Sequence, residues 1–353
     1  MSGVVATSFA FHVTYTCPLT CAHCCFNSSP QVRDSLTPDH ILAAIDALPD
    51  SIAMVAFTGG EPFLHGANLV RYVAAAHARG YQTRIVTSAY FASSAATAQR
   101  RLQPLLAAGL DELSISWDDF HEAFVAFSHV VHLCAAAVAL GISVAINSVQ
   151  SNATRWTAQA IRDQLGPLAD AVTVVCESDL NLTGRAAESF TGSDLRDSRF
   201  LGPCPYVLTG PTLSARGDLL ACCGVIPNSE RLVIAPGSQP GQLAGDIATS
   251  LHDPLLLWLH LRGPYDLLTR AAAERGLEPP AAQTIGGNCE ACRRLFDADA
   301  THGLIDPFLQ AHAGTILDEV LLLDSLGLLE PRKLIALWAR RPGGPPSNQH
   351  HPA

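Results

Sequence analysis

The sequence has few charged residues and little positive charge. Only 15% of its residues are charged, and 22 Lys and Arg against 32 Asp and Glu give a formal net charge of -10. This balance excludes the basic surface that a general affinity for nucleic acid or anionic membranes requires. The apolar runs, such as 255–259, fall far short of the roughly 18 residues that span a bilayer. Residues 1–10 lack the pattern of a secretory leader. We therefore expect a cytoplasmic protein without nucleic-acid or membrane partners.

What the chain does have is apolar residues and cysteine. Its 353 residues are 48% hydrophobic, which is enough for a large core, and the length favours one large domain with a smaller one. Eleven cysteines without a leader indicate a reducing compartment, in which thiols serve as ligands or catalysts more often than as disulfides. The tail 342–353, rich in Gly and Pro, is expected to be disordered.

Three of the cysteines form a tight motif near the start of the chain. Cys17, Cys21 and Cys24 are spaced as CxxxCxxC directly after an apolar, β-branched segment. Three thiolates at this spacing can close around one face of an iron-sulfur cube, one ligand short of the usual four. The open iron position can then bind a small molecule. A zinc site is the alternative, although zinc ligands are more often paired as CxxC or with His.

The first half alternates strand and helix patterns from residue 8 to about 176. This alternation predicts a parallel sheet with helices on its outer face. Thr37 and Pro38 have the residue types of a helix start, and the helix after the fourth strand is expected at 122–140. Parallel barrels gather their active-site groups at the C-terminal ends of the strands. The expected strands are 9–16, 51–57, 83–87, 113–116, 142–147 and 171–176.

A glycine-rich segment stands at the exit of the second expected strand. Gly59 and Gly60 allow close approach of the backbone to a ligand, and Glu61, followed by Pro62, can accept a hydrogen bond from an ammonium group. On its own the tetrapeptide also fits an ordinary Gly-Gly turn. Its position one strand-helix unit after the cysteine motif favours a shared binding site.

Together, CxxxCxxC and Gly-Gly-Glu-Pro resemble the radical S-adenosylmethionine (SAM) superfamily. The resemblance implies a partial (β/α)6 barrel over residues 1–190 and a [4Fe-4S] cluster on the three cysteines, with SAM chelated to the open iron and its amine held by the Gly-Gly-Glu-Pro segment. It also implies cleavage of SAM to a 5′-deoxyadenosyl radical, and a reductant such as flavodoxin or ferredoxin. The third strand departs from the family, ending in Thr87-Ser88-Ala89 where relatives often have Thr-Asn-Gly.

Other candidates stand at later strand exits. Ser116 occupies the first position of a Ser-x-Asp pair and, by the resemblance, contacts SAM. Asp118 and His121 are candidate catalytic residues on the substrate side, with a helix-cap role equally open for His121. Asn147 faces the same mouth and is a candidate for SAM or substrate. Arg185 stands in a Gly-Arg-Ala segment similar to that of members with an extra cluster domain, and is a candidate for a carboxylate of the cofactor, with a solvated Arg as the alternative.

The second half carries a second cysteine set, which we define as Cys204, Cys222, Cys289 and Cys292. Beyond residue 193 the alternation stops, and we expect loops rich in Gly and Pro. A hairpin presenting one thiol and a CxxC turn presenting two more can enclose a four-cysteine cluster. The spacing resembles the twitch domain, a shortened SPASM domain, and implies one auxiliary [4Fe-4S] cluster. A zinc ribbon is the alternative.

The implied domains follow from these two sets. After the barrel we expect a twitch-like cluster domain over 191–300, with its hairpin at 212–221, then C-terminal helices over 301–341. We expect no separate peptide-binding domain before the barrel.

The leading functional hypothesis is hydrogen abstraction from a ribosomal peptide or a natural-product intermediate, as in radical SAM peptide epimerases. Such enzymes return a hydrogen atom from a thiol, and Cys223 and Cys176 are the candidate donors. One alternative is a small-molecule dehydrogenase resembling the aminocyclitol dehydrogenases, in which an auxiliary cluster accepts an electron. The other is a non-catalytic zinc-binding scaffold.

Overall fold

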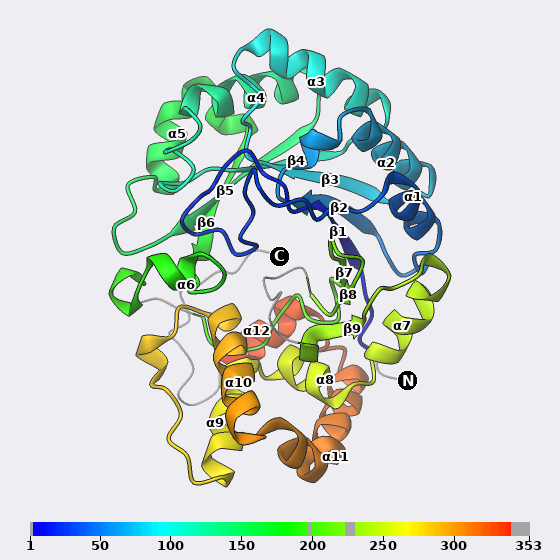
Figure 1. Ribbon diagram of the computed structural model, residues 1–353, viewed down its shortest axis with the longest axis vertical. Helices are drawn as coiled ribbons and strands as arrows, with labels where there is room; N and C mark the ends of the chain where they lie inside the picture. The colour runs from blue at the N-terminus through cyan, green and yellow to red at the C-terminus, as the bar shows by residue number, and fades with distance from the viewer. Residues whose placement is uncertain (1–2, 197–199, 223–229, 340–353) are drawn as a thin grey trace.

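The computed structural model describes residues 3–196, 200–222 and 230–339, and its upper half is a curved sheet covered by helices (Figure 1). The sheet has nine strands in the order β6-β5-β4-β3-β2-β1-β7-β8-β9, and neighbouring strands from β6 to β7 run parallel. The barrel strands are β1 (Ser8–Thr14), β2 (Met54–Gly59), β3 (Gln82–Thr87), β4 (Glu112–Ser116), β5 (Ser143–Gln150) and β6 (Thr173–Asp179). Their helices are α1 (Pro38–Asp46), α2 (Ala67–Ala78), α3 (Ala95–Ala107), α4 (Phe127–Ala139) and α5 (Ala158–Leu165). The expected parallel α/β fold is confirmed.

Local sequence signals set several of these boundaries. The Thr37 hydroxyl accepts a hydrogen bond from the His40 amide at 3.3 Å, and Pro38 occupies the first helical position of α1. Ile41 and Ile45, one turn apart, are both fully buried on the face that α1 turns to the sheet. Such a cap stabilises a helix by about 1 kcal/mol, and each large apolar side chain buried by about 1.5 to 3 kcal/mol.

One boundary is wrong in the prediction: α4 begins at Phe127, not at residue 122. The carboxylate of Asp118 accepts hydrogen bonds from the amides of Phe120 and His121, both at 3.0 Å. An aspartate that bonds its own following backbone competes with helix formation. The residues after β4 therefore form a loop at the carboxyl end of the sheet.

The second half extends the barrel sheet and adds a helical layer. The expected hairpin is present as β7 (Thr212–Leu213) and β8 (Leu219–Leu220), and it turns at Gly217, whose φ is +88°. Strand β7 pairs with β1, and β9 (Val233–Ala235) pairs with β8, so the hairpin continues the sheet of the barrel.

Below the sheet lie further helices (Figure 1). They are α6 (Ala186–Ser189), α7 (Leu243–Ser250), α8 (Pro254–Leu261), α9 (Pro264–Glu274), α10 (Asn288–His302), α11 (Ile305–Ser325) and α12 (Pro331–Ala339). Those from α7 to α10 stand where loops were expected, whereas α11 and α12 lie within the C-terminal helices expected over 301–341. The leucine-rich α8 is buried on all sides, with Trp258 packed edge-on against Phe308 at 4.9 Å between ring centroids. Because all its faces are apolar, its sequence has no helical amphipathic pattern, and the loop prediction was wrong here.

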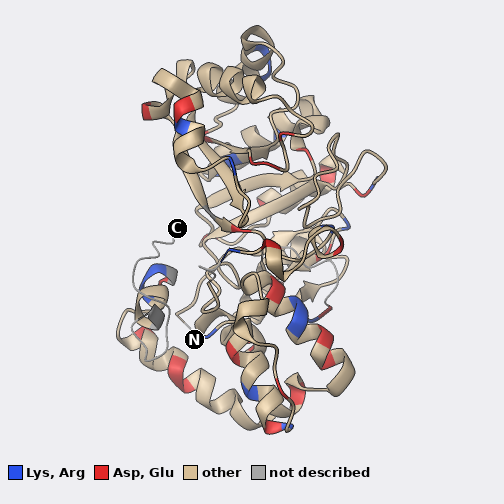
Figure 2. Cartoon of the chain, turned by 90° about the vertical axis from the view of Figure 1, so that its left-hand side faces the viewer, with Lys and Arg blue, Asp and Glu red and all other residues tan. Residues whose placement is uncertain are grey.

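Neither a membrane span nor a basic face stands out in the described chain. None of the described helices combines the length and the hydropathy that a bilayer span needs. In Figure 2 the basic side chains are scattered over separate elements, with acidic ones between them.

Candidate active site

The cysteine loop, which we define as residues 17–29, leaves the carboxyl end of β1 and returns beside it. Thr16 pairs with Ser29 in an isolated bridge, and the Cys17 amide donates to the Ser29 carbonyl at 3.1 Å. Cys17 and Cys21 are buried and Cys24 is half-buried. Burial, with smaller contributions from Glu61 and Cys24, raises the pKa of the Cys17 thiol to about 12. Metal binding at these thiols therefore releases protons.

The Gly-Gly-Glu-Pro segment packs directly against the start of this loop. The Gly60 amide donates to the Thr14 carbonyl at 2.6 Å, and the Glu61 amide donates to the Thr16 carbonyl at 3.0 Å. A Cβ atom at Gly60 would lie 2.2 Å from the Thr16 carbonyl oxygen, and one at Gly59, whose φ is +116°, would lie 2.4 Å from that of Thr14. The glycines thus let β2 approach the β1 backbone, a reason that the sequence did not reveal.

The carboxylate of Glu61 is fully buried and surrounded by donors. It accepts hydrogen bonds from the Ser88 hydroxyl at 2.6 Å, the Ser88 amide at 3.0 Å and the Thr87 hydroxyl at 2.9 Å. Burial raises the pKa of Glu61, although these hydrogen bonds oppose the shift. Thr87 and Ser88 are thus further candidate site residues, which the sequence analysis left unassigned. Their only signal was their place at a strand exit, where the family pattern is broken.

The inner face of the barrel is polar at the ends of β4 and β5. Ser116 pairs with Asn147 across these strands, and the Asn147 amide donates to the Ser114 hydroxyl at 2.6 Å. Side chains alternate along a strand, so Ser114, Ser116 and Asp118 share one face, while Leu113 and Ile115 belong to the core under the helices. Ser116 and Asn147 thus lie together on the face opposite that core.

Asp118 joins the cysteine loop to the exit of β4. Its Oδ1 atom accepts from Nδ1 of His121 at 2.8 Å, and its Oδ2 atom lies 3.4 Å from Nε2 of His23. Burial alone would raise the pKa of Asp118, but the charge and hydrogen bonds of His121 outweigh it and hold the pKa at about 2. Burial lowers the pKa of His23 to about 4. Asp118 thus acts on its neighbours, and its carboxylate is not open to a substrate.

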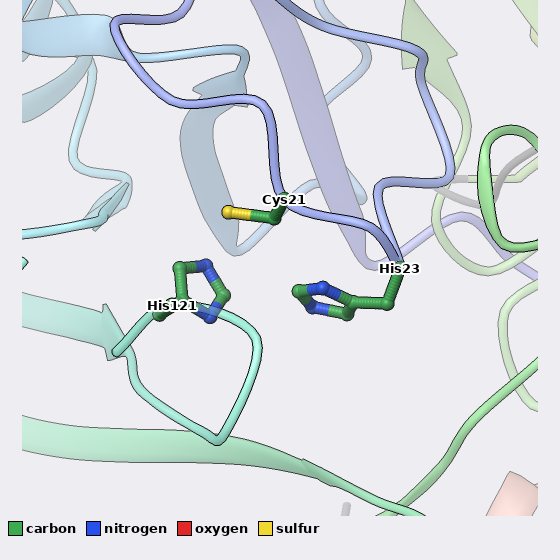
Figure 3. A group of neighbouring side chains, drawn as sticks. All are labelled: Cys21, His23 and His121. Atoms are coloured by element: carbon green, nitrogen blue, oxygen red, sulfur yellow. The ribbon is translucent and has the colours of Figure 1, made fainter. Parts of the chain in front are cut away.

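Cys21, His23 and His121 converge on one point (Figure 3). One ligand atom from each lies within 4.8 Å of the others, and Nδ1 of His23 is buried without a hydrogen-bond partner in the described chain. His23 also stacks on Phe120 at 4.6 Å between ring centroids. His23 lies inside the cysteine motif but was not singled out by the sequence analysis.

The fit of an iron-sulfur cluster to the cysteine loop can be tested on this geometry. Cys17, Cys21 and Cys24 are close enough to influence one another's pKa, yet only Cys21 belongs to the tight group that a single ion would require. Thiols on one zinc ion lie about 3.8 Å apart, because Zn–S bonds of about 2.3 Å meet at tetrahedral angles. The three thiols together suit a larger group, and the buried carboxylate of Glu61 supplies an anionic partner for an ammonium.

The second cysteine set also converges. Burial and the proximity of Cys204, Cys289 and Cys222 raise the pKa of Cys292 well above its usual value. Cys289 and Cys292 lie in the first five residues of α10, so the expected CxxC turn is a helix start. In the part of the chain that the structure describes, the ligand atoms of Cys21, His23 and His121 lie within 4.8 Å of one another. None of the four cysteines of the second set belongs to that group.

The two candidate thiol donors are placed differently. Cys176 packs, like Val174 on the same face of β6, against the core under the helices, and Ser148 lies beside it. The structure thus puts its thiol on the helix side of the sheet, away from the inner face of the barrel. Cys223 lies outside the described residues. Arg185, expected near a cofactor carboxylate, instead contacts the backbone of the cysteine loop.

Known proteins resemble this chain in its barrel. Residues 11–149 match the family model described as Radical SAM superfamily. Over 119 residues the chain is 26% identical to YydG of Bacillus subtilis (strain 168), provisionally named a peptide biosynthesis protein. That match covers 33% of this chain and 37% of the relative, so it spans little more than a third of the relative's length.

Two solved structures are similar over a longer stretch. One is anSMEcpe with bound AdoMet, with a TM-score of 0.51 and 12% identity over 88% of this chain and 99% of that one. Another is BtrN in complex with AdoMet and 2-DOIA, with a TM-score of 0.46 and 16% identity over 74% of this chain and 87% of that one. The first likeness shows a shared fold. Residues 11–149, which match the Radical SAM superfamily model, contain both the cysteine motif and the Gly-Gly-Glu-Pro segment.

Proposed function

We propose that this protein is an enzyme that reductively cleaves SAM and abstracts a hydrogen atom from a ribosomal peptide or a natural-product intermediate. The observation that carries the proposal is the packing of the cysteine loop against the Gly-Gly-Glu-Pro segment. It places three thiols and the buried carboxylate of Glu61 at adjacent strand exits. A cluster held by three thiols has the open iron position that SAM chelation needs.

The roles of the chain's own residues follow from their placement. Cys17, Cys21 and Cys24 would hold the cluster, and Glu61, held by Thr87 and Ser88, would accept from the SAM amine. When bound, the cluster and SAM supply an electron and a deoxyadenosyl radical. Ser116 and Asn147, paired across β4 and β5, are proposed contacts for SAM or substrate at the same mouth. Their hydroxyl and amide groups can orient a polar ligand without adding charge.

The second cysteine set is proposed to hold an auxiliary [4Fe-4S] cluster. Four thiols converge there, which is a complete ligand set, so this cluster would carry electrons and leave no open iron. These four thiols do not form a group whose ligand atoms all lie within 4.8 Å of one another, which supports a cluster over a zinc ribbon. An external reductant such as flavodoxin or ferredoxin would supply electrons to the first cluster.

For the substrate we propose a peptide and, as the reaction, epimerisation. The name of YydG refers to peptide biosynthesis, which supports a peptide substrate. The radical would take a hydrogen atom from a backbone carbon, and a thiol would return one from the opposite face. The thiyl radical left behind would then need one electron and one proton from the reductant. Cys223, next to Cys222, remains the proposed donor, while the placement of Cys176 argues against that residue.

The test is anaerobic turnover of the reconstituted protein with SAM and dithionite. We expect 5′-deoxyadenosine from the wild type and none from a Cys17→Ala, Cys21→Ala, Cys24→Ala variant. Bound zinc without acid-labile sulfide in the wild type would instead establish the zinc scaffold. Candidate peptides are then added in heavy water and analysed by mass spectrometry.

The mass of the product separates the two reactions. Epimerisation replaces one hydrogen of the peptide with one solvent-derived deuterium without other change, and Cys223→Ala should abolish that exchange. A loss of two hydrogens would show that the substrate is oxidised, and the second cysteine set is then the proposed electron acceptor. A dehydrogenase or cross-linking activity would then replace epimerisation.

A further inference from the structure

A short segment, residues 180–185, runs between the two cysteine sets and bonds to both sides. At one end, the half-buried guanidinium of Arg185 donates to the Cys21 carbonyl at 2.8 Å and to the Ser28 carbonyl at 2.7 Å. The Arg185 amide donates to the Cys24 carbonyl at 3.0 Å. One residue thus binds the cysteine loop at three carbonyls, two of them on predicted cluster ligands.

Gly184, the residue before Arg185, packs against the same loop. Gly184 has a φ of +53°, and a Cβ atom there would lie 2.4 Å from the Cys25 carbonyl oxygen and 2.7 Å from that of Cys24. A side chain at this position would push the two backbones apart. The left-handed conformation also favours glycine over any other residue. Gly184 therefore sets the close approach that lets Arg185 reach the loop.

The opposite side of the segment rests on the helix that carries the second cysteine set. The Leu182 carbonyl accepts from Nε of Arg293, the residue after Cys292, at 3.0 Å. A Cβ atom at Gly286, just before α10, would lie 2.7 Å from the Leu180 carbonyl oxygen. The segment is thus held from the second cysteine set while it holds the first.

We propose that Arg185 is a positioning residue that orders the cysteine loop before metal binds, and that residues 180–185 brace this loop against α10. Three loop carbonyls converge where a planar, forked guanidinium and one amide can satisfy them together. A lysine ammonium is a single point charge on a flexible stem and cannot reproduce the fork. The claim that this order prepares the loop for a cluster rests on the proposed function. The claim that Arg185 orders residues 17–29 does not depend on it.

Hydrogen exchange of the metal-free protein tests the brace directly. We expect Arg185→Gln to speed amide exchange in residues 17–29 by about tenfold or more, because two carbonyls lose a charged donor. Exchange in β2 to β4 should stay unchanged, which shows that the barrel is folded. Amide exchange of residues 17–29 in Arg185→Lys should be faster than in the wild type and slower than in Arg185→Gln. Arg33→Gln is the matched control, because exposed Arg33 also donates to a backbone carbonyl just after the loop, that of Val32 at 3.2 Å.

Reconstituted protein gives a second readout. We expect the [4Fe-4S] cluster of Arg185→Gln, followed by its absorbance and by iron and sulfide content, to be lost to a chelator about tenfold faster than in Arg33→Gln. Unchanged exchange in Arg185→Gln would overturn the brace. An intact loop and cluster with weakened SAM binding would also overturn it, and would return Arg185 to the cofactor carboxylate. If the wild type takes up no iron and sulfide, the proposed function fails, and hydrogen exchange still decides the brace.

Discussion

His23 in the cysteine loop and Asp118 at the exit of β4 face each other, with 3.4 Å between Nε2 and Oδ2. The same carboxylate accepts from the Val149 amide at 3.3 Å and from Nδ1 of His121 at 2.8 Å. One buried side chain therefore ties together the cysteine loop, the loop after β4 and strand β5. Asp118 is better described as a positioning residue than as the catalytic residue that the sequence suggested.

This relationship predicts the effect of Asp118→Asn. The amide NH2 group would point a donor at groups that already donate, so buried donors would lose their partner. We expect the free energy of unfolding of the metal-free protein to fall by about 1 to 3 kcal/mol in urea denaturation. Glu122→Gln, which removes a more exposed carboxylate from the same loop, should cost less than about 1 kcal/mol. Equal losses in the two variants would contradict the role of Asp118.

A second prediction concerns metal competition at Cys21, His23 and His121. Asp118 orients both imidazoles, as carboxylates commonly do for metal-ligating histidines. We expect the metal-free protein to bind Co²⁺ at this group with thiolate charge-transfer absorption, and we expect Zn²⁺ added beforehand to slow cluster assembly. Cys17→Ser should keep the Co²⁺ spectrum, since Cys17 lies outside this group. A spectrum unchanged in His121→Ala would rule out the site.

The sequence predicted the features that depend on local chemistry. The cap at Thr37, the cysteine spacing and the Gly-Gly-Glu-Pro segment each lie within a few consecutive residues. The bonds of Ser88 to Glu61 and of Arg185 to Cys21 join distant parts of the chain, and only the fold brings them together. Cys176 was predicted as a donor from its place at the end of a strand, but its thiol lies on the helix side of the sheet. The cause is that an error of one residue along a strand moves a side chain to the other face.

The Gly-Gly-Glu-Pro segment gives a third prediction. A methyl group at Gly60 would meet the Thr16 carbonyl at 2.2 Å, and backbone on both sides would have to move. We expect Gly60→Ala to lower the free energy of unfolding by more than about 2 kcal/mol and to weaken SAM binding, because Glu61 would shift with it. Gly245→Ala is the control. It lies in helix α7 with open space around its Cβ position, so it should stabilise the protein by about 0.5 to 1 kcal/mol. A Gly60→Ala protein as stable as the wild type would show that the two strand exits are not packed as described.

The last prediction separates the two cysteine sets by their metal content. Cys292 is buried, and the cysteines that raise its pKa belong to the second cysteine set, so Cys292→Ala should remove about half of the bound iron and sulfide and leave the first cluster intact. Cys134→Ala is the matched control, since Cys134 is fully buried within α4 and packs in the core under the helices. It should keep all the iron and lose only packing energy. Electron paramagnetic resonance of the reduced proteins then distinguishes the clusters, because SAM should alter the signal that remains in Cys292→Ala. If Cys292→Ala instead loses zinc and keeps all its iron, the second cysteine set is a zinc site. Any oxidation of the substrate would then need an electron acceptor outside this chain.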